Sequence, residues 1–157
     1  MTGQIGAPVY IESMYITESS FRLSDQPANA MSLNLSVEFE KGELRSNEDG
    51  SAKTESVTLS VRASLVSQDA PDDKRMSVFV RVEGTVGTPA ETPFRDDEDA
   101  ARYLSTNGAS FLYSHIRSYV MTLTGLSPMG AFILPPVLPQ AVVERALHGQ
   151  AEGEGQV

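Results

Sequence analysis

Few side chains in this 157-residue chain could do chemistry, and they are not spaced to do it together. His115 and His148 are the two histidines, and they lie on separate predicted helices without a His-x-x-x-His pair or a third metal ligand. Ser114 is adjacent to His115 on one predicted helix, where neighbouring side chains point apart instead of forming a nucleophile–base contact. Cysteine is absent, which excludes thiol nucleophiles and thiolate metal sites. The sequence therefore predicts a protein that is not an enzyme and binds no cofactor and no metal.

Three polar segments have the composition of ion or phosphate sites without their spacing. The acidic run at 96–99 is typical of a solvated first helical turn, with a cation site as the alternative. The segment 47–55, NEDGSAKTE, lacks the spaced ligands of a calcium loop and is predicted to be a hairpin turn. The segment 83–89, EGTVGTP, lacks the lysine and the helix start of a phosphate-binding loop. None of them indicates a catalytic centre.

The first half of the chain is patterned as strands. Apolar residues alternate with polar ones over 32–40, 56–65 and 75–86, and a period of two is the mark of a half-buried antiparallel strand. The segment 8–24 is a fourth, less regular candidate, which we expect to be bent or broken. The connections are rich in Gly, Asp and Pro, which favours hairpins. We therefore expect the strands to pair in meander order.

The second half is patterned as helices. Apolar residues recur at three- and four-residue spacing over 110–125, which predicts an amphipathic helix with one apolar stripe, ending at Gly125. Asn107-Gly108 predicts a kink or break before it, since glycine costs about 1 kcal/mol in a helix interior. A second helix is expected to begin at Pro139 and to end near Gly149.

One domain accounts for these elements. Strands at 9–89 followed by helices at 96–148 predict an α+β domain over residues 9–148. The N-terminus, 1–8, is expected to be flexible, and the polar tail, 149–157, to be disordered.

The charge balance narrows the choice of partners. A formal net charge of −9 argues against nucleic acid, whose phosphates demand basic stripes, and against anionic membrane surfaces. The N-terminus has neither the basic nor the apolar region of a secretory signal, and no apolar run approaches the roughly 20 residues that span a bilayer. The sequence predicts a cytoplasmic protein without nucleic-acid binding or membrane insertion.

The segment 132–139, FILPPVLP, is apolar yet can form neither a regular helix nor a central strand. Pro135, Pro136 and Pro139 lack amide donors and push the residues before them toward extended conformations. The segment must therefore run extended, with its apolar side chains against the protein's own core or against a partner.

A series of short motifs occurs in a fixed order along the chain. It comprises YITESSF at 15–21, RASL at 62–65, Leu112-Tyr113, Arg117, Phe132-Ile133-Leu134 and Pro136-Val137. In order and ungapped spacing, from about residue 10 to residue 147, these motifs resemble the SecB protein-export chaperones. The chain departs from that family at Ser114, where the family has proline, at Ser118, where it has glutamate, and in the turn at 127–130. The fold should survive these changes.

The resemblance implies both a fold and a function. The fold would be a four-stranded antiparallel sheet backed by a long helix and a shorter C-terminal helix, joined by an extended crossover. The function would be that of an ATP-independent holdase, which binds unfolded polypeptides in apolar grooves formed partly by the crossover. Some crossover side chains would face the core instead. The client-binding residues expected on this basis are Phe111, Phe132, Leu134, Val137, Leu138 and Val142.

The resemblance also implies a homo-oligomer, a dimer of dimers. The predicted strand at 75–86 would help to pair the protomers, or its apolar face would pack on the long helix instead. The side chains concerned are Val78, Val80 and Val82.

SecB-like proteins bind the basic tail of the translocase ATPase SecA on an acidic patch of the sheet. The corresponding positions of this chain are Glu18, Arg22, Phe79 and Arg81. One acid is kept and two are reversed in sign, and a like charge facing a basic partner repels it. We therefore expect weak SecA binding or none.

Two other functions are compatible with the same residues. The first is a dedicated module that shields one partner, as in SecB-like chaperones associated with toxin–antitoxin pairs. The second and more distant one is a carrier of a small apolar ligand. Protection of several unrelated unfolded proteins would favour the general chaperone, and protection of a single partner would favour the dedicated module.

Overall fold

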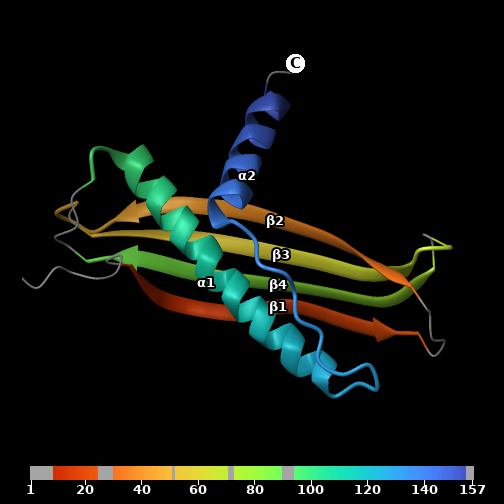
Figure 1. Cartoon of the computed structure of the whole chain (residues 1–157). Coiled ribbons are helices and arrows are strands. Elements are labelled where there is room, and N and C mark those ends of the chain that lie inside the picture. The colour runs from red at the N-terminus through yellow and green to blue at the C-terminus, as the bar shows by residue number, and fades with distance from the viewer. Residues whose placement is uncertain (1–8, 25–29, 51, 71–72, 90–93, 155–157) are drawn as a thin grey trace, which may run out of the picture.

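The computed structural model describes residues 9–24, 30–50, 52–70, 73–89 and 94–154, with side chains described as far as Gly149. A twisted four-stranded antiparallel sheet is crossed on one face by a long helix (Figure 1). The elements in chain order are β1 (Tyr10–Leu23), β2 (Met31–Ser46), β3 (Lys53–Ser67), β4 (Lys74–Thr88), α1 (Asp97–Gly125) and α2 (Pro139–Glu154). The expected α+β class, with one long and one shorter helix on the sheet, is confirmed.

The strand order differs from the expected meander. The sheet runs β1-β4-β3-β2, so β2, β3 and β4 form a meander while β1 pairs with β4 on its other side. The prediction for β1 is therefore wrong. The order places β3 and β4, whose inward side chains are almost all buried, in the middle of the sheet. The more polar β1 and β2 take the edges, where one side of each strand faces solvent.

β1 is a single strand with two irregularities. Its pairing with β4 shifts register between Ile11 and Ser13 and again between Ile16 and Glu18. Each shift is a bulge, which inserts an extra residue and bends the strand locally without ending it. The bulges account for the irregular pattern seen over 8–24, where we expected a bent or broken strand.

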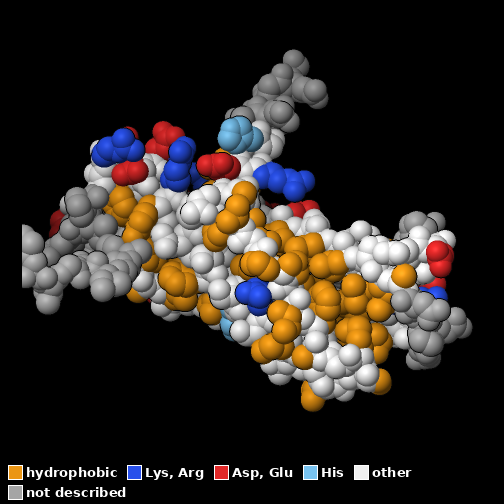
Figure 2. All heavy atoms as spheres, in the orientation of Figure 1, with side chains coloured by type: hydrophobic (Ala, Val, Ile, Leu, Met, Phe, Trp, Pro, Cys, Tyr) orange, Lys and Arg blue, Asp and Glu red, His pale blue; other side chains and the backbone are white. Residues whose placement is uncertain are grey.

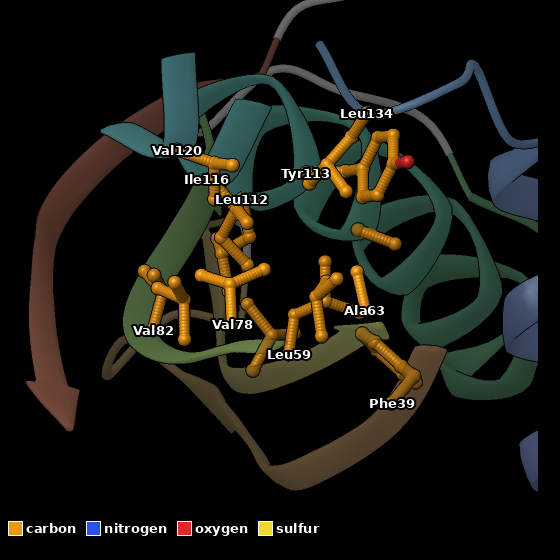
Figure 3. Close-up of a cluster of buried hydrophobic side chains, with 14 of the residues drawn as sticks. Phe39, Leu59, Ala63, Val78, Val82, Leu112, Tyr113, Ile116, Val120 and Leu134 are labelled. Carbon is orange, nitrogen blue, oxygen red and sulfur yellow. The ribbon is translucent and has the colours of Figure 1, made fainter. Parts of the chain in front are cut away.

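The core lies between α1 and one face of the sheet. Leu112, Ile116 and Val120 form the predicted stripe on α1, and all three are completely buried. Figure 3 shows them above Val78 and Leu59 of the two central strands. Full burial of such a side chain contributes about 1.5–3 kcal/mol, so this stripe fixes α1 on the sheet.

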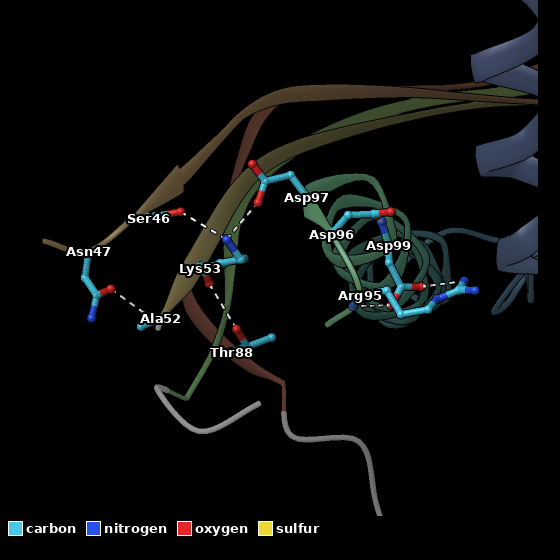
Figure 4. A network of polar contacts seen from close by, with 9 residues as sticks. All are labelled: Ser46, Asn47, Ala52, Lys53, Thr88, Arg95, Asp96, Asp97 and Asp99. Carbon is cyan, nitrogen blue, oxygen red and sulfur yellow. Dashed lines mark hydrogen bonds and ion pairs between the residues drawn. The ribbon is translucent and has the colours of Figure 1, made fainter. Parts of the chain in front are cut away.

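The first turn of α1 is capped and tied to the sheet (Figure 4). Asp96 is the N-cap, and its carboxylate accepts a hydrogen bond from the backbone N–H of Asp99 at 2.8 Å. Lys53 of β3 forms an ion pair with Asp97 at 2.9 Å. The acidic run at 96–99 is thus a capped helix start, as predicted.

Gly108 lies inside α1, which is continuous from Asp97 to Gly125. The predicted kink or break at Asn107-Gly108 is therefore wrong. A Cβ atom at Gly108 would lie 3.1 Å from Cγ2 of Val57 and 3.4 Å from Cγ2 of Val86. The glycine allows close approach of the helix backbone to the sheet, and this packing compensates its low helix propensity.

α2 begins at Pro139, as predicted, and packs against β2 and α1. It extends to Glu154, beyond the predicted end near Gly149, and it projects past the β2 edge of the sheet (Figure 1). The disorder expected for the tail concerned 149–157, of which residues 155–157 lie outside the described residues, as does the flexible N-terminus expected at 1–8.

Candidate functional site

The segment 126–138, here called the crossover segment, connects the end of α1 to α2 and runs back alongside α1 (Figure 1). Side chains of α1 hold its backbone. Tyr113 Oη donates a hydrogen bond to the carbonyl of Pro135, and Arg117 Nε donates to the carbonyl of Leu134 at 2.9 Å. Thr124 Oγ1 accepts from the backbone N–H of Phe132 at 2.7 Å. The extended conformation is therefore maintained by hydrogen bonds to a helix and not by pairing with a strand.

Burial favours the donor role of Tyr113. Its phenol is buried, which raises its pKa above the ordinary value of 10.0, while the nearby charge of Arg117 lowers it. The group therefore remains protonated at neutral pH and can donate to the Pro135 carbonyl.

Gly130 makes the turn at which the chain begins to run back along α1. Its φ of 81° is a backbone conformation that favours glycine.

Burial varies residue by residue along the crossover segment. Leu134 is completely buried and lies beside Tyr113 in the core (Figure 3). By contrast, Ile133 is 61% exposed and Leu138 is 72% exposed. Phe132 and Val137 are half-buried and pack against the core with part of their surface. One leucine therefore anchors the segment, and its neighbours present apolar surface to solvent.

β2 adds apolar side chains on the same face of the sheet. Phe39 is buried in the core, and alternation places Val37, Leu35 and Leu33 on the same side of the strand. Leu33 is exposed, and the other two are half-buried. Because β2 is an edge strand, no other strand of the described chain pairs with its outer side.

These side chains form the candidate site, here called the crossover surface. Figure 2 shows hydrophobic side chains gathered on the helix-bearing face of the molecule. The crossover surface consists of Leu33, Leu35 and Val37 of β2, Ile133, Val137 and Leu138 of the crossover segment, and Val142 of α2. Such a surface can bind apolar side chains of a partner, and its edge strand offers unpaired backbone groups.

A hollow separates α2 from β2 within this surface. Its volume is about 370 Å³, and Val37 and Phe39 of β2 line it together with Val142 and Ala146 of α2. Glu38, Glu40 and Arg145 also line it, so the hollow combines apolar walls with charges of both signs. The hollow can therefore accept apolar or amphipathic side chains of a partner.

The histidine and acidic side chains of the described residues are not grouped as metal ligands. No group of three or more His, Cys, Asp or Glu side chains there could hold a metal ion. His148 Nδ1 lies 2.7 Å from the carbonyl of Glu144 on its own helix. No helix of the described residues is long and apolar enough to cross a membrane.

The six predicted client-binding residues differ in where the structure places them. Phe132, Val137, Leu138 and Val142 lie on or beside the crossover surface with part of their side chains accessible. Phe111 is half-buried on α1 and packs against the core.

Leu134 is the exception among these residues. Since it is completely buried, its assignment to client binding is corrected to a core position.

Sequence reasoning missed Ile133 and the β2 leucines. Ile133 occupies the same apolar run, but the run does not reveal which of its residues faces outward, because prolines disturb the alternation. The period of two over 32–40 marked Leu33 and Leu35 as apolar. That pattern alone could not show that α1 leaves the start of β2 uncovered.

The three valines expected at an oligomer interface are core residues. Val78, Val80 and Val82 are at most 2% exposed and face α1. Their assignment to a protomer interface is therefore corrected, and the alternative of packing on the long helix is the observed arrangement. Aspartate at Val80 or Val82 would place a charge in the core and unfold the sheet instead of separating protomers.

The four positions of the expected SecA patch do lie together on the opposite face of the sheet. Glu18 of β1 pairs in register with Arg81 of β4, Phe79 at the next outward position of β4 pairs with Ser20, and Arg22 pairs with Ser77. Arg62 of β3 lies over the Phe79 ring, 4.7 Å from its centroid.

Neighbouring acids already engage one of these arginines. Arg81 forms ion pairs with Glu40 at 3.7 Å and with Glu83 at 3.9 Å. The face is therefore of mixed charge and not an acidic patch.

No known family model matches the chain, and no curated protein matches its sequence. Among solved structures, the chain is similar to the SecB-like chaperone Rv1957 of Mycobacterium tuberculosis, which was solved in complex with a ChAD peptide from the Rv1956 HigA1 antitoxin. The TM-score is 0.56 at 21% identity, over 83% of this chain and 91% of that chain. A protein of unknown function from Streptococcus agalactiae matches with a TM-score of 0.51 at 8% identity, over 82% of this chain and 97% of that one.

At these identities the likeness is one of fold. The chain has a SecB-like fold, as the resemblance of its sequence motifs indicated.

Proposed function

We propose that this protein is an ATP-independent holdase chaperone that binds unfolded polypeptides on the crossover surface. The observation that carries the proposal is the exposure of Ile133 and Leu138 on a segment whose backbone is fixed by α1. Apolar side chains held in place lose little conformational entropy when a client binds, which favours capture without an energy source. No catalytic step and no cofactor enter this function.

The free edge of β2 supplies the second half of the binding mode. An extended client segment can add to the outer side of β2 and form main-chain hydrogen bonds that do not depend on its sequence. Its alternate side chains then meet Leu33, Leu35 and Val37 on the helix-bearing side of the strand. Main-chain pairing and apolar contacts together account for recognition of many different unfolded chains.

A dedicated module for one partner is the second candidate. It is favoured by the similarity to a SecB-like chaperone solved with a peptide from an antitoxin. The same surface would then bind a single peptide segment of a partner protein. A carrier of a small apolar ligand is less favoured, because the hollow beside α2 is lined by three charged side chains as well as by apolar ones.

The proposal includes a homo-oligomer in the cytoplasm. Assembly through β4 valines is excluded by their burial, so we expect protomers to pair through surfaces that remain exposed. β1 offers such a surface, since it is an edge strand that exposes Tyr10, Ile11 and Tyr15. Sedimentation as a compact monomer at micromolar concentration would contradict this part of the proposal.

Aggregation assays with two unrelated unfolded proteins test the main proposal. The wild-type protein is expected to suppress aggregation of both. The double variant Ile133→Ser, Leu138→Ser should bind clients about tenfold more weakly or worse, because the two lost apolar contacts together are worth more than the roughly 1.4 kcal/mol of a tenfold change. Leu126→Ser is the matched control, since Leu126 is 88% exposed and lies outside the crossover surface.

The outcomes of this assay separate the candidates. Protection of both clients that is lost in the double variant alone supports the holdase. Protection of neither client, together with tight binding of one peptide, would favour the dedicated module. Equal losses in the double variant and the Leu126→Ser control would refute the crossover surface as the binding site.

A further inference from the structure

Glu55 of β3 is a carboxyl group inside the interface between the sheet and α1. Its side chain is 1% exposed, and its Oε1 accepts a hydrogen bond from the hydroxyl of Ser105 on α1. Its Oε2 is buried and has no hydrogen-bond partner among the described residues. An ionised carboxylate is poorly accommodated there, because a buried charge needs a partner for each of its oxygens.

The charged groups around Glu55 come from several elements. Lys41 of β2 acts on it electrostatically, and Lys53 of β3 is already paired with Asp97 of α1. Glu98 and Arg102 of α1 line a neighbouring cavity together with Lys41, Asp97 and Ser105. Val86 of β4 is the residue paired with Glu55 in the sheet, and Leu147 of α2 also lines the cavity.

The backbone of α1 approaches the sheet most closely at the same level. At Gly108, one turn beyond Ser105, a Cβ atom would lie 3.1 Å from Cγ2 of Val57 and 3.4 Å from Cγ2 of Val86. Glu55, at 1% exposure, has almost no contact with solvent while the helix stays in place. A cavity of about 600 Å³ adjoins Ser105, and it offers a nearby space into which a charged carboxylate could be solvated.

We propose that Glu55 and Ser105 form a proton-linked latch between β3 and the first half of α1, closed when the carboxyl group is protonated and loosened when it is ionised. The protonated acid carries no charge and keeps its contact with the Ser105 hydroxyl. The ionised acid must gain hydrogen bonds for Oε2, and it gains them by opening the helix–sheet contact toward the cavity. The second half of α1 remains in place, because Tyr113, Arg117 and the buried Leu134 hold it to the crossover segment.

The latch operates near neutral pH. Burial raises the pKa of Glu55 from 4.5 to about 7, while the Ser105 hydrogen bond and the charge of Lys41 lower it. The two forms are therefore both populated at neutral pH, where a small change in pH alters their ratio.

Hydrogen exchange of α1 as a function of pH tests the latch. Protection factors, which correct for intrinsic chemical exchange, are measured for the segments 97–108 and 112–124 between about pH 5.5 and about pH 8.5. In the wild-type protein, protection of 97–108 should fall by about tenfold or more between about pH 5.5 and about pH 7 and level off above pH 7, while 112–124 changes less. A wild-type profile without this step, or an equal loss along all of α1, would overturn the proposal.

Two variants make the test specific. Glu55→Gln keeps the shape of the side chain without its titration, so the step in protection should disappear. A step of unchanged size in Glu55→Gln would assign it to another group and refute the latch.

Ser105→Ala keeps the carboxyl group and removes the hydrogen bond that lowers its pKa, so its step should move to higher pH. A step that stays in place or moves to lower pH would refute the role of Ser105, even if Glu55→Gln failed to fold.

Discussion

Arg117 Nε donates to the carbonyl of Leu134 at 2.9 Å, so a helix side chain holds the backbone of the crossover segment at its most deeply buried residue. Tyr113 Oη donates to the next carbonyl, that of Pro135. Two consecutive carbonyls in a proline-rich segment are thereby satisfied without a strand partner. This arrangement leaves the side chains of Ile133 and Leu138 largely exposed to solvent.

Tyr113→Phe should loosen this arrangement. The variant keeps the buried ring and loses one hydrogen bond, so the free energy of unfolding should fall by about 1 kcal/mol. Client affinity should fall a few-fold as well, because the crossover segment becomes less preorganised. Urea unfolding and client titration measure the two effects.

Tyr103→Phe is the control for this prediction. Tyr103 packs on Phe94 with ring centroids 5.6 Å apart, and neither residue belongs to the crossover segment. Equal losses of client affinity in both variants would contradict the role of the Tyr113 hydroxyl.

Leu134 and Leu138 form a matched pair for separating core from binding surface. Leu134→Ala should destabilise the protein by about 2–5 kcal/mol, since it creates a cavity in the core. Leu138→Ala should change stability by less than about 0.5 kcal/mol and weaken client binding instead. Thermal unfolding and client titration of both variants check this. A loss of stability in Leu138→Ala with a loss of binding alone in Leu134→Ala would show that the crossover segment is oriented differently.

Gly108→Ala should destabilise the protein although alanine favours helices. The new Cβ atom would lie 3.1 Å from Cγ2 of Val57, and overpacking of this kind costs about 1–3 kcal/mol against a helix-propensity gain of about 1 kcal/mol. Gly149→Ala on α2, where no atom lies within 4 Å of the new Cβ, should be neutral or stabilising. Urea unfolding compares the two, and equal effects would argue against close packing at Gly108.

The stability of the protein should fall as pH rises toward neutrality. Glu55 has an ordinary pKa of 4.5 that burial raises to about 7, so the folded state holds its proton more tightly than the unfolded state does. The unfolded state releases this proton first as pH rises. The contribution of Glu55 is therefore lost progressively between its two pKa values, by roughly 3 kcal/mol in total, and is constant above the folded-state value.

Glu55→Gln should remove this dependence. Urea unfolding at about pH 5 and about pH 8 would show a smaller difference in the variant than in the wild-type protein. At the higher pH the variant should be the more stable of the two. A wild-type protein that gained stability over this interval, with the variant following it, would show that other carboxyl groups dominate.

Binding to the basic tail of SecA should be weak or absent. Arg22 and Arg81 lie on the outer face of the sheet, where they would repel a basic peptide. Isothermal titration with the tail peptide at physiological salt measures this, and micromolar binding by the wild-type protein would contradict the prediction.

Charge reversal provides the positive arm of that experiment. The double variant Arg22→Glu, Arg81→Glu should create affinity for the tail. The variant Arg45→Glu, Arg95→Glu makes the same change in net charge at exposed side chains away from this patch. This control variant should not gain affinity for the tail. Affinity gained equally by both variants would reflect net charge alone.

The local patterns of the chain were predictable because they depend on neighbouring residues. A period of two over 32–40, 56–65 and 75–86 is sufficient to indicate strands, since successive side chains of a strand point to opposite faces. The cap at Asp96 and the start of α2 at Pro139 follow equally from the chemistry of a single helical turn. The resemblance of ordered motifs then indicated the fold.

Tertiary structure decided what local patterns could not. The pairing of β1 with β4, the close approach at Gly108 and the burial of Val78 under α1 all depend on segments far apart in the sequence. The first two features overturned expectations drawn from local signals, and the third overturned an expectation drawn from the family resemblance.

The candidate site was likewise predicted in part by the sequence and decided in part by the tertiary structure. The prolines at 135, 136 and 139 by themselves determined that the crossover segment is extended, because they remove amide donors and restrict φ. Which side chains point inward depended on the carbonyls that Tyr113 and Arg117 hold, and so on how α1 lies against the returning chain. The burial of Glu55 could not be predicted from a polar hairpin sequence, because it arises only where α1 covers the start of β3.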